Sequence, residues 1–204
     1  MKALFRLLAL GFALLSGALP CIATDLELEV RNAAGGLIAD AVVYAEPATG
    51  PAPQVRPGLR AVVDQVNKEF VPRVSIVQAG TEIFFPNSDN IRHSIYSFSP
   101  AKTFTTKLYS GREAAPVQFD KTGLVILGCN IHDTMVAWVF VVDTPWFAKT
   151  DTNGAAIIKA LPPGEYHISA AAPSSAGSQK SRPVSLRIEA GASQRQAIAL
   201  EAGG

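Results

Sequence analysis

The chain of 204 residues has few side chains that bind metals or form cross-links: two cysteines, three histidines and two methionines. Cys21 lies in an apolar segment at the N-terminus, so removal of that segment would leave Cys129 as the only thiol. A single thiol excludes a disulfide framework. It also excludes a binuclear metal centre with two bridging thiolates. Three histidines are too few for an enzyme that needs two different metal centres. The sequence contains no Ser-His-Asp arrangement and no paired-carboxylate motif that would indicate an enzyme.

Two further patterns are missing. There is no basic run and no interleaving of aromatic with basic residues, so nucleic-acid binding is not expected. There is also no long segment with a helical period; apolar residues alternate in short runs separated by Gly, Pro, Asn and Asp. The sequence therefore predicts an all-β protein.

Residues 1–23 have the organisation of a secretory signal peptide. A basic start at Lys2 and Arg6 precedes an apolar stretch over 7–19 and small residues up to Ala23. About thirteen apolar residues fall short of the roughly twenty that span a bilayer, so no stable membrane span is expected after cleavage near Ala23. Pro20 suits lipidation of Cys21 poorly. Without Lys2 and Arg6, sixteen basic residues face seventeen acidic ones, a net charge of −1. We expect export to a periplasm.

Four side chains form a recognisable ligand set. Cys129, His132 and Met135 lie within seven residues, and His93 lies upstream. One thiolate and two imidazoles with a weak axial thioether are the ligands of mononuclear blue-copper centres that transfer electrons. The alternative is a buried structural cysteine, a core histidine and a gap-filling methionine. The sequence therefore predicts one copper ion bound by these four residues.

The predicted strands place these ligands on loops. Residues 74–85 read as two alternating strands around a glycine turn, and the polar cluster 86–90 ends the second, so His93 follows a strand. Residues 124–127 form a buried strand before the cysteine, and 136–142 form another after the methionine. The three late ligands then occupy the loop of one hairpin, where a rigid sandwich can hold them together.

Residues 60–143 resemble the cupredoxin family, in particular amicyanin and plastocyanin domains. Longer proteins of this pattern are labelled methylamine-utilisation proteins. The resemblance rests on Phe70-Val71-Pro72, Val77–Gly80, Phe84–Asp89, His93, and two-residue gaps between Cys129, His132 and Met135, as in amicyanin. It implies a Greek-key sandwich with one type 1 copper ion. It also implies that the N–H of Ser94 donates to the Cys129 sulfur and that Asn87 ties the two ligand loops together.

The outer segments resemble another module. A strand over 26–30, a Gly-rich turn and a strand over 41–45 come first; the turns Asp151–Gly154 and Leu161–Gly164 and a strand over 165–170 come late. This order is similar to the transthyretin-like, carboxypeptidase regulatory-like β-sandwich. We therefore expect a cupredoxin domain inserted into it, with crossings at 47–57 and 143–146. The expected division is signal peptide 1–23, first outer strands 24–50, copper domain 51–143 and remaining outer strands 144–204. A separate N-terminal hairpin is the alternative.

The expected function is that of a one-electron carrier or relay, not an enzyme, whose partner is a redox protein such as a cytochrome or dehydrogenase. In this reading Cys129 gives the main electronic path, and His132 at the loop tip is the exit for the electron. Two alternatives are a periplasmic copper-binding or delivery protein and a non-redox interaction module. A storage protein would be expected to expose many Met, His or Cys side chains, which are scarce here.

Other conspicuous residues have simpler readings. His167 is expected to be a surface or edge side chain, and Trp138 and Phe140 to lie in the core. Asp151 and Asn153 are expected to form a turn. No glutamate follows them at the spacing of a calcium loop.

Overall fold

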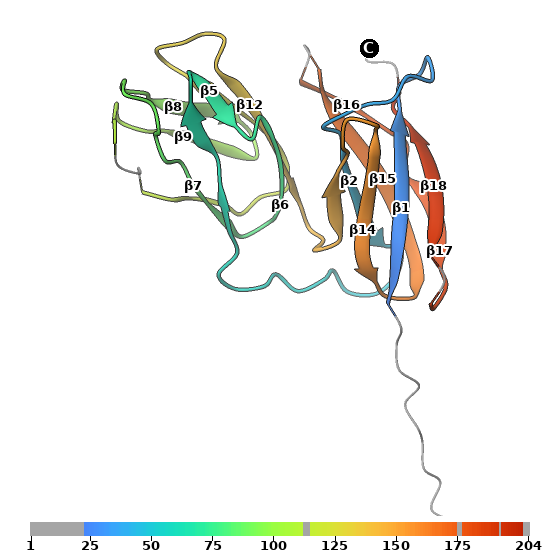
Figure 1. Cartoon of the computed structure of the whole chain (residues 1–204). Coiled ribbons are helices and arrows are strands. Elements are labelled where there is room, and N and C mark those ends of the chain that lie inside the picture. The colour runs from blue at the N-terminus through green and yellow to red at the C-terminus, as the bar shows by residue number, and fades with distance from the viewer. Residues whose placement is uncertain (1–22, 112–114, 175–176, 192, 202–204) are drawn as a thin grey trace, which may run out of the picture.

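A computed structural model describes residues 23–111, 115–174, 177–191 and 193–201, and within these ranges the chain forms only strands, turns and loops (Figure 1). The predicted all-β class is therefore confirmed. The described part contains no helix with the length and apolarity that a bilayer crossing requires. The predicted signal peptide lies outside the described residues, except for Ala23.

The middle of the chain forms one β-sandwich, called here the site sandwich. Its sheets have the strand orders β10-β7-β3 and β6-β12-β11-β8-β9, and a small hairpin, β4-β5, lies beside them. The strands are β3 (Arg60–Val62), β4 (Asp64–Val66), β5 (Glu69–Val71), β6 (Val74–Gln78), β7 (Thr81–Phe84), β8 (Ile95–Ser99), β9 (Lys102–Thr105), β10 (Val117–Phe119), β11 (Gly123–Cys129) and β12 (Val136–Val142).

Side-chain alternation explains why these segments form strands. Along β12, Ala137, Val139 and Val141 belong to the core of the site sandwich and are at most 3% exposed. The residues between them point to the other face, as the two-residue period of a strand requires. β11 and β12 pair antiparallel from Gly123↔Val141 to Gly128↔Val136, so the predicted hairpin around residues 130–135 is present.

The described segments before and after the site sandwich form a second sandwich, called here the flanking sandwich. Figure 1 shows it beside the site sandwich. Its sheets have the orders β14-β1-β18 and β13-β2-β15-β16, with β17 also pairing with β15. The strands are β1 (Thr24–Arg31), β2 (Val42–Pro47), β13 (Phe147–Lys149), β14 (Ala155–Leu161), β15 (Gly164–Ser174), β16 (Gly177–Lys180), β17 (Val184–Ile188) and β18 (Gln194–Ala199).

The early strands occupy central positions in the flanking sandwich. β1 lies between β14, its antiparallel partner, and β18, its parallel partner. β2 lies between β13 and β15 and is antiparallel to both. Their buried residues share one core with those of the late strands, including Leu26, Val43, Ile158 and Ile168. Residues 24–47 and 147–199 thus contribute to the same two sheets.

A third apolar cluster joins the two sandwiches. Phe140 and Val74 of the site sandwich pack with Val42 and Ala171 of the flanking sandwich, and Trp138 packs against them half-buried. Trp138 and Phe140 were expected in the core. Phe140 is buried in this core cluster, which confirms the expectation, and Trp138 packs against it half-buried. The cluster lies between the sandwiches because these two residues occupy the outer face of β12 while their neighbours fill the inner face. Burial of one such large apolar side chain stabilises the fold by about 1.5–3 kcal/mol.

Candidate metal centre

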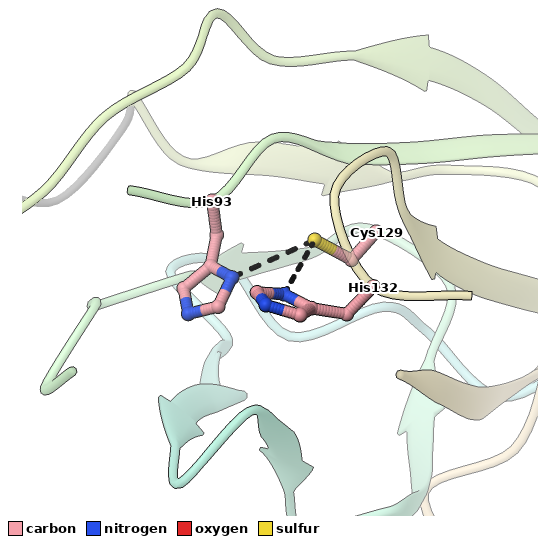
Figure 2. A group of neighbouring side chains, drawn as sticks. All are labelled: His93, Cys129 and His132. Carbon is pink, nitrogen blue, oxygen red and sulfur yellow. Dashed lines mark hydrogen bonds between the residues drawn. The ribbon is translucent and has the colours of Figure 1, made fainter. Parts of the chain in front are cut away.

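Three donor atoms converge beside the β11–β12 hairpin (Figure 2). The Cys129 Sγ lies 3.6 Å from the His93 Nδ1 and 4.0 Å from the His132 Nδ1. All three atoms lie within 4.8 Å of one another. Cys129 ends β11, His132 lies in the following loop, and His93 lies between β7 and β8.

Backbone hydrogen bonds fix the strand end and both loops. His93 and Tyr109 form a bridge in which each N–H donates to the other's carbonyl, at 2.9 and 3.0 Å. Cys129 pairs with Ile95 of β8. The N–H of Met135 donates to the carbonyl of His132 at 3.0 Å, which closes the turn inside the loop. The donors are therefore placed mainly by the backbone.

The separations of the donors fit a single metal ion. Bonds of about 2.3 Å to sulfur and about 2.0–2.1 Å to nitrogen, as zinc makes them, place sulfur and nitrogen about 3.6–3.8 Å apart at angles of about 110–120°. The observed distances of 3.6 and 4.0 Å are close to this range.

Burial differs among the three donors. His93 is fully buried and Cys129 is 3% exposed, whereas His132 is half-buried. Its neighbour Ile131 is 53% exposed. Solvent is thus excluded from two donors, and the third lies where a partner can approach. A soft thiolate with imidazoles is a donor set that suits copper.

The imidazole of His93 has a partner on its other side. Its Nε2 lies 2.8 Å from the Oδ2 of Asp89, whose side chain is 11% exposed. Burial by itself raises the pKa of Asp89, but hydrogen bonds from the N–H of Lys68, from His93 and from the N–H of Asn67 outweigh it and lower the pKa. Asp89 is therefore held as a carboxylate that accepts hydrogen bonds.

The two predicted outer-shell residues have the following contacts. The Asn87 Nδ2 donates to the carbonyls of Ile91 and Tyr109, at 2.9 and 3.0 Å. These contacts organise the loop that carries His93. The Ser94 Oγ donates to the carbonyl of Thr106. Donation from the Ser94 N–H to the Cys129 sulfur stays a prediction.

Asn130 links the two ligand loops. Its N–H donates to the carbonyl of Ser94, and its Nδ2 donates to the Ser94 Oγ, both at 3.0 Å. Sequence reasoning missed this role, which it had given to Asn87 by resemblance. It also missed Asp89, which was named only within the polar cluster that ends a strand and within the family resemblance. A carboxylate four residues before His93 was the available signal.

Met135, the predicted axial ligand, is 1% exposed and belongs to the same core cluster as Cys129. It also lines a cavity of about 140 Å³ together with Phe70 and Arg73. Its role as a ligand stays a prediction.

The residues with simpler readings lie away from this centre. His167 is exposed on β15, with its Nδ1 3.3 Å from the Ser185 Oγ. The carboxylate of Asp151 accepts hydrogen bonds from the N–H groups of Asn153 and Ala155, which confirms the predicted turn.

No family model matches the sequence, and no curated protein matches it. Similar solved structures include a Cu-containing nitrite reductase (NirK) from Thermus scotoductus SA-01, at 25% identity, 47% of this chain, 25% of that chain and a TM-score of 0.39. An amicyanin variant in its reduced Cu(I) form is 18% identical over 48% of this chain and 98% of its own, with a TM-score of 0.38. A purple cupredoxin from Nitrosopumilus maritimus is 20% identical over 41% of this chain and 98% of its own, with a TM-score of 0.35.

The chain thus spans a quarter of the nitrite reductase and nearly all of the other two proteins, which cover about half of it. Since all three TM-scores are below 0.5, the candidate metal centre is inferred only from the distances between its own donor atoms. The resemblance of the flanking sandwich to the carboxypeptidase regulatory-like module stays a prediction.

Proposed function

We propose that this protein is an exported mononuclear copper protein that carries single electrons, with a type 1 centre of His93, Cys129, His132 and the axial Met135. The observation that carries the proposal is the convergence of one sulfur and two imidazole nitrogens at the separations a single ion requires. This donor set is that of blue-copper electron carriers. Among divalent first-row metals, copper binds a given set of nitrogen and sulfur donors most tightly.

A bound copper ion would supply a one-electron couple. The chain supplies a frame that changes little between the two oxidation states, because the ligand positions are set by strand pairing and by loop hydrogen bonds. The buried His93 and Cys129 keep water from the ion. The half-buried His132 offers a short path to a docked partner.

The setting and architecture belong to the same proposal. The protein acts in a periplasm after loss of residues 1–23, as a carrier and not as an enzyme, and exchanges electrons with a cytochrome or dehydrogenase. The copper domain, 51–143, is an insertion between the two parts of the flanking sandwich, 24–50 and 144–204. The central positions of β1 and β2 among the late strands support the insertion.

Copper loading of the full chain without its leader tests the centre. We expect an intense visible band from thiolate-to-Cu(II) charge transfer, lost in Cys129→Ser and retained in the control His167→Ala. Met135→Leu should keep the band and raise the reduction potential. A band that persists without Cys129 would sink the assignment. Copper at a hundredfold excess over its Kd should also stabilise the folded state by about 2.7 kcal/mol, seen as a higher melting temperature.

A further inference from the structure

The tip of the β4–β5 hairpin contacts the loop that carries His93. The N–H groups of Asn67 and Lys68 donate to the two carboxylate oxygens of Asp89, at 2.6 and 2.9 Å. Both residues have positive φ angles, 54° and 63°. Such a two-residue turn needs the left-handed conformation at both positions, which costs a residue other than glycine about 1–2 kcal/mol. The turn thus directs two adjacent N–H groups at one carboxylate despite a conformational cost at Lys68.

The Asp89 carboxylate also contacts the imidazole of His93, the proposed metal ligand. The Asp89 Oδ2 lies 2.8 Å from the Nε2 of His93. A carboxylate only accepts hydrogen bonds, so Nε2 carries the proton. In a neutral imidazole the other nitrogen then has a free lone pair, and this nitrogen, Nδ1, is the one that lies 3.6 Å from the Cys129 sulfur. The contact with Asp89 therefore selects the tautomer that can bind an ion next to Cys129.

The β4–β5 hairpin is anchored to the site sandwich by one core side chain and by hydrogen bonds. Phe70 is 2% exposed in the core of the site sandwich. The Nε2 of the fully buried Gln65 donates to the carbonyl of Pro86 at 3.0 Å. The N–H of Ser88 donates to the carbonyl of Gln65, also at 3.0 Å. The carboxylate is thus held from the hairpin side and from its own loop.

We propose that Asp89 is a positioning residue of the metal centre, held by the tip of the β4–β5 hairpin. It fixes the tautomer and ring orientation of His93, and its charge favours Cu(II) over Cu(I). Such partners of metal-bound histidines raise the basicity of the ligand. The copper part rests on the function proposed above, whereas the tautomer is a property of the chain itself.

The first experiment reads the tautomer without metal. Histidine ¹⁵N NMR of the reduced, metal-free full chain, at a pH where the ring is neutral, should show His93 protonated at Nε2 in the wild type. Asp89→Ala should move it toward the Nδ1-protonated form. Asp89→Asn is the milder variant, because its amide has one acceptor oxygen for three N–H donors, and it should weaken the Nε2–H hydrogen bond. An unchanged His93 spectrum in the folded variants would overturn the proposal.

Asp64→Asn is the matched control. Asp64 lies in the same hairpin and accepts hydrogen bonds from the Ser88 Oγ at 2.7 Å and from the N–H of Gln65. The substitution removes the same charge and loosens the contact between the same hairpin and the same loop, but the hydrogen bonds of Asp64 are to Gln65 and Ser88 and not to His93. It should leave the His93 tautomer unchanged. A shift equal to that of the Asp89 variants would show a general loosening of the loop and overturn the proposal.

The second experiment reads the copper centre. Asp89→Asn should lower the Cu(II) affinity by about 10- to 100-fold relative to the wild type and to Asp64→Asn, with a smaller loss for Cu(I). Each tenfold difference between the two losses raises the potential by about 59 mV. Equal potentials in the Asp89 and Asp64 variants would contradict the electrostatic part. If the wild type bound no copper, the proposed function would fail, and the tautomer measurement would still decide the role of Asp89.

Discussion

Gly128 is the position at which an added methyl group tests the packing next to Cys129. A Cβ there would lie 2.5, 2.6 and 2.9 Å from the Cζ, Oη and Cε1 atoms of Tyr96. Favourable carbon contacts lie at about 3.5–4.0 Å, so the ring would have to move by roughly 1 Å. Tyr96 pairs with Gly128 across β8 and β11, and its ring centroid lies 5.1 Å from that of Phe98. The ring cannot move without disturbing this pair.

The expected magnitude is the balance of two terms. Overpacking costs about 1–3 kcal/mol, and exchange of a strand glycine for alanine returns about 0.5–1 kcal/mol through reduced backbone freedom. Since Tyr96 is only half-buried, the ring can partly move toward solvent, and the cost should lie near the lower end. With a cost of about 1–2 kcal/mol and a return of about 0.5–1 kcal/mol, Gly128→Ala should destabilise the fold by up to about 1.5 kcal/mol.

A double-mutant cycle in urea denaturation measures this coupling. In the Tyr96→Ala background the clash is absent, so Gly128→Ala should become neutral or stabilise the fold by up to about 1 kcal/mol. The single substitution should also disturb the visible band of the copper-loaded protein, because Cys129 is the next residue. If Gly128→Ala were equally destabilising with and without the Tyr96 ring, the reasoning from this contact would be wrong.

Three further predictions concern the partner surface, a turn and the architecture. Ile131→Ser should slow electron exchange with a small cytochrome in stopped flow and leave copper affinity nearly unchanged. The same substitution at the control position Ile157, which is 47% exposed, should leave the exchange rate unchanged. Rapid Cu(I) transfer to an acceptor with negligible electron exchange would instead favour a copper-delivery protein. The N–H groups of Ala155 and Asn153 lower the pKa of the Asp151 carboxyl below its ordinary value of 3.8. The ionised carboxylate therefore stabilises the fold above about pH 3.8, and this stabilisation is lost as the pH falls further. The urea midpoints of the wild type and Asp151→Ala should differ at neutral pH and converge in acid. A fragment of residues 55–145 should fold and bind copper, whereas 146–204 should fold poorly by circular dichroism because it lacks β1 and β2; a well-folded late fragment would refute the insertion.

The ligand hairpin shows why part of the centre was predictable. Cys129 ends the apolar strand β11, and His132 and Met135 lie in the short loop before the apolar strand β12, so hairpin pairing alone brings the two ends of this segment together. Spacing therefore gave the position of Cys129 relative to His132 without knowledge of the remaining fold. The contribution of His93 was available because a polar cluster ends the preceding strand and leaves it on a loop.

The surroundings of that hairpin depended on contacts between distant segments. Trp138 and Phe140 read as core residues from their chemistry, and only the presence of a second sandwich determined that they lie between two sheets. The role expected of Asn87 falls to Asn130, since hydrogen-bonding side chains of similar chemistry are distinguished only by where the loops meet. Residue type gives the capacity for such a contact and not the partner.

The sequence by itself determined the all-β class, the strand pairs next to each turn and the candidate metal donors, because alternation and short spacing act through the local backbone. The tertiary structure decided which strands lie between which: β1 and β2 pair with strands more than a hundred residues later in the chain. It also placed the tip of the β4–β5 hairpin, and with it the carboxylate of Asp89, against His93. Contacts of this kind depend on how whole sheets pack, and no local pattern encodes them.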